Sequence, residues 1–168
     1  MSYNTFDLFG SFNGSIFTPF TGSQFGLETN QSGSDNAFVA SASEGNDLNY
    51  SFFSNPSHTL SGELDSLEIG IGLDKSAADW STDSSMLGIN GLADFINDGT
   101  DASGNIIGRN TGDNDVHNIV WGLMNGDTSA LADVLSGAGV DLNAAITTAG
   151  TVSYAAPVES VELLEMAA

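Results

Sequence analysis

Apolar and polar residues alternate in several short runs between residues 22 and 92, and such alternation predicts half-buried β-strands. The connections between the runs are short and rich in Gly, Asn, Ser and Asp, which favours antiparallel neighbours. The sequence therefore predicts six strands, at Ser23–Glu28, Ala37–Ser43, Asp47–Phe53, Thr59–Leu64, Leu67–Leu73 and Met86–Leu92.

The apolar face changes once between Thr59 and Leu73. Leu60 and Leu64 have one parity, whereas Leu67 and the apolar positions that follow it have the other. Because a shift of one residue reverses the two faces of a strand, we expect a β-bulge or a sharp bend near Asp65–Ser66 in an otherwise continuous strand.

Helical spacing replaces the alternation after residue 112. The segment DNDVHNIVWGLMNGD predicts a helix that Asp113 or Asn114 can cap, and DTSALADVLSGAG predicts a second helix behind Asp127 or Thr128. A third short helix is expected in DLNAAITTAG. Strands grouped before helices predict an α+β fold, a curved antiparallel β-sheet with helices packed on one face.

The N-terminal segment also has a nearly helical spacing of aromatic residues, although glycines and Pro19 weaken it. We expect a helix end whose phenylalanines pack on the core. These residues are Phe6, Phe9, Phe12, Phe17 and Phe20.

Composition restricts the class of partner. The 168 residues fit one domain, and 22 acidic residues against two basic ones, Lys75 and Arg109, give a net charge of −20. This charge excludes electrostatic attraction to nucleic acid, and the chain has no apolar run long enough for membrane insertion. Cysteine is absent, which excludes thiolate nucleophiles and cysteine-based metal sites.

Two other kinds of site have weak support. A serine hydrolase would need a nucleophile turn, and no G-x-S-x-G motif is present. The tract NDGTDASGN offers oxygen ligands for calcium but matches neither the EF-hand nor the nonapeptide spacing. Because of its Asp, Asn and Gly loops and its acidic charge, a calcium-dependent extracellular adhesin or matrix domain is the alternative hypothesis for the function. A hydrolase with an unrecognised site is the third hypothesis.

The stretch LNYSFFSNPSHTL contains a tyrosine and a histidine on either side of a reversal. Tyr50 shares a strand face with Leu48 and Phe52, which would suit an aromatic residue packed across strands. Asn55-Pro56 favours a turn that brings His58 close to the phenol. A phenolate is a hard oxygen donor suited to Fe³⁺, and an imidazole that hydrogen-bonds to it would orient it.

The segment GNDLNYSFFSNPSHTLSGELDSLEIG resembles the haem-ligating loop and following strand of the HasA-type bacterial haemophores. VHNIVWGLMNGDTSALADVL resembles the helix pair of the same family, so that the resemblance extends roughly from Gly22 to Ile146. It implies a secreted carrier of ferric haem b, not an enzyme, with Tyr50 as the axial ligand of the iron and His58 in support. It also implies an apolar haem-facing surface, which we map to Phe52, Phe53, Leu60, Trp121 and Met124.

The resemblance extends to the C-terminal tail. VESVELLEMAA is similar to the uncleaved signal that an ABC-type exporter reads in this family, and the N-terminus lacks the features of a cleavable secretory signal. The expected organisation is a single haem-binding domain at 1–155 and a C-terminal secretion signal at 156–168. The implied location is extracellular, and the implied partner is an outer-membrane haemophore receptor.

One departure from the family concerns the second iron ligand. That ligand is usually a histidine on a long N-terminal loop, whereas no histidine precedes His58 here and the loop looks truncated. His117 aligns with a helical histidine and is expected to pack or to cap. The distal side of the iron is then expected to hold water, a weak donor or no ligand, with apolar cover from Phe17, Phe20 or Phe25.

Overall fold

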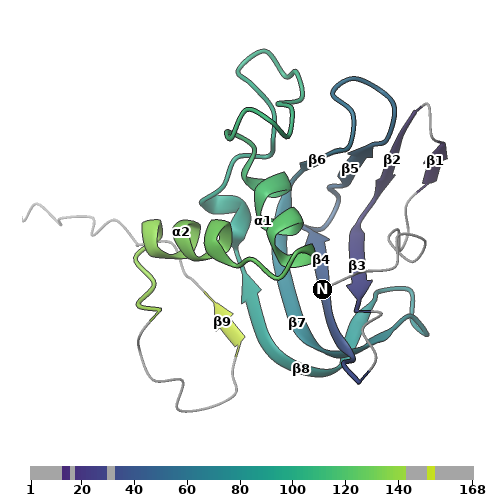
Figure 1. Cartoon of the computed structure of the whole chain (residues 1–168), viewed down its shortest axis with the longest axis vertical. Coiled ribbons are helices and arrows are strands. Elements are labelled where there is room, and N and C mark those ends of the chain that lie inside the picture. Colours follow the sequence, from purple (N-terminus) through teal and green to yellow (C-terminus); the bar gives the residue numbers. More distant parts are fainter. Residues whose placement is uncertain (1–12, 16–17, 30–32, 143–150, 154–168) are drawn as a thin grey trace, which may run out of the picture.

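The computed structural model describes residues 13–15, 18–29, 33–142 and 151–153, whose strands form two sheets (Figure 1). The first sheet has the order β1-β2-β5-β6, with β1 at Asn13–Ser15, β2 at Thr18–Gly22, β5 at Leu48–Ser51 and β6 at Thr59–Gly62. The second has the order β3-β4-β7-β8-β9, with β3 at Gln24–Glu28, β4 at Asn36–Ala42, β7 at Leu64–Asp74, β8 at Ser81–Asn90 and β9 at Thr151–Ser153.

The chain passes between the two sheets with almost no interruption. Only Ser23 separates β2 from β3, and only Glu63 separates β6 from β7. At the second crossing Gly62 has φ 111°, and a Cβ there would lie 2.3 Å from the Asp47 carbonyl oxygen. Glycine is required at this position because the backbones approach so closely.

The expected irregularity near Asp65–Ser66 is confirmed. Ser41 pairs with Ser66 and Ala42 pairs with Leu64, so Asp65 is the extra residue of a β-bulge. The expectation of one continuous strand from Thr59 to Leu73 is wrong, because the strand breaks at Glu63 and its two parts belong to different sheets.

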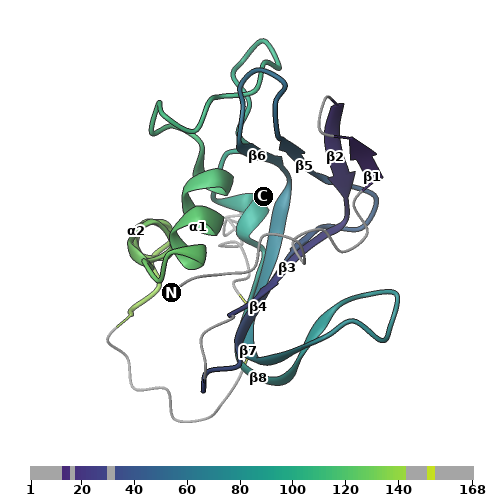
Figure 2. The same cartoon turned by 45° about the vertical axis from the view of Figure 1, so that its right-hand side comes forward.

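Both helices lie against one face of the second sheet (Figures 1 and 2). They are α1 at Asp115–Met124 and α2 at Ser129–Gly137, preceded by a short 3-10 helix, η1, at Leu92–Asp94. Their apolar faces bury the side chains that the helical spacing indicates, and each fully buried aliphatic side chain contributes roughly 1.5–3 kcal/mol. The shared core includes Leu27, Phe38, Leu67, Ile119, Leu123 and Leu131. The α+β prediction with helices on one face is therefore confirmed.

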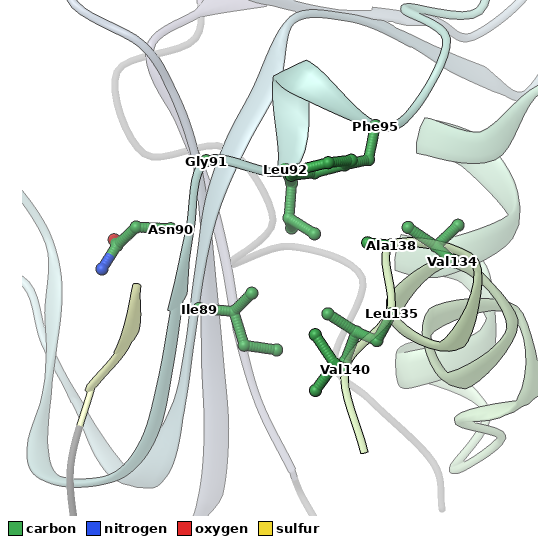
Figure 3. A pocket seen from close by; sticks show the side chains of 9 residues that line it. All are labelled: Ile89, Asn90, Gly91, Leu92, Phe95, Val134, Leu135, Ala138 and Val140. Carbon is green, nitrogen blue, oxygen red and sulfur yellow. The ribbon is translucent and has the colours of Figure 1, made fainter. Parts of the chain in front are cut away.

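Helix α2 packs tightly on β8 and η1. Ile89 and Leu92 face Val134 and Leu135 across an apolar crevice (Figure 3). The crevice has a volume of only about 10 Å³, so it holds no more than about one water molecule. This contact stabilises the core and leaves no room for a ligand.

The strand predictions hold with shifted ends, and two parts of the pattern differ. Strand β8 begins at Ser81, five residues before the expected start, and β9 adds a parallel strand beside it that the pattern did not predict. Phe20 lies in β2, not in a helix. Phe6, Phe9, Phe12 and Phe17 lie outside the described residues, as does most of the expected third helix.

Asn114 caps α1, as one of the two expected caps. Its side-chain oxygen accepts a hydrogen bond from the His117 N–H at 2.9 Å. Thr128 occupies the cap position of α2 without a side-chain hydrogen bond, while Asp127 accepts hydrogen bonds from Ser129. Across the described part of the chain, no helix is long and apolar enough to cross a membrane.

Candidate ligand-binding site

Tyr50 lies in the middle of a row that crosses three strands of the first sheet. It stands opposite Phe20 of β2 on one side and opposite Leu60 of β6 on the other. Residues directly opposite each other present their side chains on the same face of a sheet. The half-buried Tyr50 ring therefore lies beside a fully buried leucine and packs against the core.

His58 returns to Tyr50 through the reversal between β5 and β6. The His58 N–H donates a hydrogen bond to the Phe52 carbonyl at 3.2 Å, and His58 has a left-handed backbone with φ 53°. This geometry places His58 Nδ1 3.3 Å from the Tyr50 hydroxyl oxygen. The structure thus brings together the phenol and the imidazole that the sequence pattern singled out.

Two phenylalanines complete an aromatic group around this pair. The Phe52 ring centroid lies 6.2 Å from that of Tyr50, 4.8 Å from that of His58 and 4.7 Å from that of Phe53. Phe53 leaves 57% of its surface exposed. The site therefore has a polar centre, the phenol and imidazole, beside an apolar surface open to solvent.

The N-terminal turn of α1 supports the strand opposite Tyr50. The Leu60 N–H donates to His117 Nδ1 at 3.2 Å, and the Leu60 carbonyl accepts from the Asn114 side-chain amide at 3.0 Å. Because β6 is an edge of the first sheet, these two buried side chains satisfy backbone groups that a neighbouring strand would otherwise pair. The sequence analysis treated Asn114 only as a helix cap, and sequence spacing gives no signal for its bond to Leu60.

Burial shifts the pKa values of Tyr50 and His117 so that both side chains favour their neutral forms. Burial raises the pKa of Tyr50 above its usual value of 10.0, and the nearby Arg109 charge partly opposes this effect. Burial, followed by the Arg109 charge, lowers the pKa of His117 to about 4. At neutral pH the free protein therefore holds a neutral phenol and a neutral His117.

The other expected contact residues have different positions. Leu60 is only 2% exposed and lies in the core, and Met124 is half-buried against it. Trp121 is 53% exposed on α1 and stacks on His117, with 6.1 Å between ring centroids and a 10° interplanar angle. Of these three side chains, Trp121 offers the most open apolar surface.

The expected apolar cover changes as well. Phe25 is buried and packs on Phe38 at a centroid distance of 6.2 Å, so it is a core residue and not a lid over the site. Phe20 lies beside Tyr50 in the first sheet, and Phe17 falls outside the described residues.

The donor set decides which kind of metal the site can hold. Within the described ranges, no group of three or more His, Cys, Asp or Glu side chains has an arrangement that could hold a metal ion. A single phenol oxygen with an imidazole neighbour suits iron whose other ligands come from a macrocycle. The open apolar surface suits the flat face of such a ring.

The acidic loop considered for calcium uses its carboxylates internally. Asp98 accepts hydrogen bonds from the backbone and hydroxyl of Thr100. Asp101 accepts bonds from Ser103 and Asn105, and these bonds lower the pKa of Asp101. The carboxylates thus act as turn-forming residues, which accounts for the composition of the tract without a metal.

A polar groove of about 290 Å³ lies on the other face of the second sheet. Its main polar side chains already bond within the protein. Gln24 exchanges hydrogen bonds with the Trp80 backbone, and Glu68 accepts from Thr82. These groups hold the folded-back β7–β8 hairpin, so the Tyr50 site remains the better candidate for a ligand.

Comparison with known proteins identifies the family of this chain. The family model of heme-binding protein A (HasA) matches residues 4–166. The chain belongs to the HasA family. A curated relative, the hemophore HasA of Serratia marcescens, is 37% identical over 134 residues, which are 76% of this chain and 58% of that protein. The chain thus spans little more than half the length of this HasA relative.

Solved HasA structures share the fold. The apo hemophore HasA of Yersinia pestis matches with a TM-score of 0.58 at 24% identity, covering 87% of this chain and 76% of that one. A holo hemophore HasA of the same organism matches with a TM-score of 0.54 at 23% identity, covering 81% and 73%. At this level of identity the two HasA structures establish the α+β architecture alone.

Proposed function

We propose that this protein is an extracellular haemophore that binds ferric haem through the Tyr50 oxygen. The observation that carries the proposal is the 3.3 Å approach of Tyr50 to His58 Nδ1 within a half-buried aromatic group. Membership of the HasA family, and the HasA relative described as a hemophore, support it. The protein would act as a carrier of haem and not as an enzyme.

The residues of the site fit ferric haem chemically. The porphyrin supplies four nitrogen ligands, so the protein needs to provide only one strong donor, and a phenolate suits Fe³⁺. The Tyr50 proton has to leave on binding, and the adjacent His58 Nδ1 can accept it or a hydrogen bond from it. A carboxylate is not required for this step.

The apolar contacts follow from exposure. Phe53 and Trp121 are the expected contact residues with the most open side chains, while the Phe52 ring packs against the His58 imidazole. Leu60 and Met124 would support the site from the core. Burying exposed aromatic surface under a porphyrin contributes roughly 25 cal/mol per Å².

Titration with ferric haem tests the proposal. We expect a shifted Soret band and a charge-transfer band typical of tyrosinate iron in the wild-type protein, and loss of that band in Tyr50→Phe. An unchanged haem spectrum together with a calcium-dependent rise in melting temperature would favour the adhesin alternative instead.

We further propose export by an ABC-type exporter and docking on an outer-membrane receptor, which would place the protein outside the cell. The tail at 156–168 would carry the export signal, and residues 1–155 would form the haem-binding domain. Deleting Glu159–Ala168 should leave haem binding intact and retain the protein inside the producing cell. Loss of haem binding in that truncation would make the tail part of the folded domain.

A further inference from the structure

Arg109 lies on a loop that is attached to the Tyr50 site. Its backbone N–H donates a hydrogen bond to the buried Thr59 hydroxyl at 3.3 Å, directly beside His58 in the sequence. The preceding Gly108 lies against Pro56, because a Cβ built there would stand 3.3 Å from the Pro56 Cβ. The loop that precedes α1 and the β5–β6 loop therefore project together from one end of the molecule (Figures 1 and 2).

The guanidinium of Arg109 is exposed and acts on the site electrostatically. Its charge lowers the pKa of both Tyr50 and His117, in keeping with the attachment of the Arg109 backbone to Thr59. No ion pair involving Arg109 is present within the part of the chain that the structure describes, although the chain carries 22 acidic residues. The one arginine of the protein thus presents an unneutralised charge beside the candidate ligand site.

An anionic ligand needs such a charge in this protein. With a net charge of −20, the field of the whole protein repels anions. Ferric haem b carries two carboxylates at one edge of its ring. A guanidinium pairs with a carboxylate through two parallel hydrogen bonds, a geometry that lysine cannot provide.

We propose that Arg109 binds a carboxylate of the porphyrin and thereby selects tetrapyrroles that carry acidic side chains. This inference rests on the proposed haem-binding function and adds an edge contact to the iron ligand. Tyr50 would hold the metal, the exposed aromatic residues would contact the ring face, and Arg109 would fix the orientation of the ring in its plane.

The test uses Arg109→Gln with Lys75→Gln as the matched control. Both variants remove one positive charge, but Lys75 lies 5.5 Å above the Trp80 ring on the β7–β8 hairpin, whose tip folds back toward β3. Each protein is titrated with ferric haem and with ferric haem dimethyl ester, in which both carboxylates are blocked. Urea unfolding of each variant confirms that the fold is retained.

We expect Arg109→Gln to weaken haem binding by roughly 10- to 100-fold, the usual range for a hydrogen bond to a charged group. The affinity of wild type for the ester should be as low as the affinity of Arg109→Gln for haem. For the ester, wild type and Arg109→Gln should have the same affinity. Lys75→Gln should bind haem like wild type. The Arg109 effect should also diminish at high salt, because salt screens exposed charges.

Three results would overturn the inference. Equal losses for haem and ester in Arg109→Gln would show that Arg109 acts on the phenol or the fold and not on a carboxylate. Haem binding by Arg109→Gln at wild-type strength would show that no such contact exists. If wild type does not change the spectrum of added haem, the haem-binding function itself is refuted. The titration of wild type distinguishes this result from the other two.

Discussion

The imidazole of His117 accepts a hydrogen bond from the Leu60 backbone N–H at 3.2 Å, and Leu60 stands opposite Tyr50 in the first sheet. This hydrogen bond connects the start of α1 to β6, the strand that pairs with the strand of Tyr50. Since Nδ1 accepts the bond, the remaining ring proton resides on Nε2. The contact requires a neutral imidazole, which links the stability of the site to pH.

Stability should therefore fall in acid through His117. The pKa of His117 is about 4 in the folded protein against 6.5 in a free side chain, so the unfolded chain binds a proton between these values and the folded chain does not. This contribution is fully present above pH 6.5 and is lost as the pH falls to 4, by roughly 3 kcal/mol.

The measurement compares free energies of unfolding of wild type and His117→Gln from pH 7 to pH 4. Glutamine keeps an acceptor oxygen but does not titrate, and the acidic residues common to both proteins cancel in the difference. The advantage of wild type over the variant should shrink on acidification. Parallel pH profiles for the two proteins would show that folding does not lower the pKa of His117.

The Tyr50 and His58 pair predicts unequal effects of two substitutions. Tyr50→Phe removes the donor atom for iron, whereas His58→Ala removes only its hydrogen-bonding neighbour, which typically changes metal-site affinity 10- to 100-fold. Competition with a haem-binding reference protein would measure both affinities. Equal and negligible losses would return Tyr50 to a role in packing between Phe20 and Leu60.

The ionisation of Tyr50 in the free protein gives an independent check on its surroundings. Burial raises its pKa, so the phenol should ionise above pH 10, and Arg109→Gln should raise this pKa further because Arg109 lowers it. The difference in ultraviolet absorbance between each protein and its Tyr50→Phe counterpart isolates this one tyrosine. Ionisation below pH 10 would mean that the phenol is open to solvent.

Sequence patterns predicted the elements of this fold better than their arrangement. The apolar residues alternate along β3, β4 and β7 and have helical spacing along α1 and α2, because one face of each element is buried. These patterns therefore predicted where the elements lie in the sequence. The chain crosses from the first sheet to the second beside Gly62, which lies close to the Asp47 backbone, and no periodicity reveals that crossing. The parallel pairing of β9 with β8 joins segments about sixty residues apart in the sequence and leaves no local signal.

The same distinction applies to the candidate site. Tyr50 and His58 are eight residues apart, and a turn between them was enough to predict their proximity. Arg109 and Asn114 reach the same region only through the tertiary contact of α1 with β6, so neither emerged as a site residue from the sequence. The family resemblance led us to place Leu60 on the haem-facing surface, whereas the structure buries its side chain in the core.

Gly62 should be far less tolerant of substitution than Gly112, although both have positive φ. A Cβ at Gly62 would lie 2.3 Å from the Asp47 carbonyl oxygen and 2.9 Å from the Leu48 Cα, whereas nothing lies within 4 Å of one at Gly112. Gly112→Ala should cost about 1 kcal/mol for the left-handed backbone alone. Gly62→Ala should cost about 3 kcal/mol or more, because the backbones of two strands must separate. Equal shifts of the urea midpoint would show that β5 and the end of β6 are not in close contact in solution.

The coordination of iron in the proposed complex is the last prediction. The chain has only two histidines, and each has a structural position that opposes direct ligation of haem held by Tyr50. His58 lies next to the phenol itself and would therefore be on the Tyr50 side of a bound iron, and His117 is buried with Nδ1 bonded to Leu60. Tyr50 should therefore be the one strong protein ligand, with water or a weak donor opposite it, and electron paramagnetic resonance of the ferric complex should show a high-spin signal.

His117→Gln serves as the control for this coordination and should leave the high-spin signal unchanged. A low-spin signal that disappears in His117→Gln would mean that α1 leaves β6 when haem binds, and a low-spin signal that persists would place a second strong ligand elsewhere in the chain.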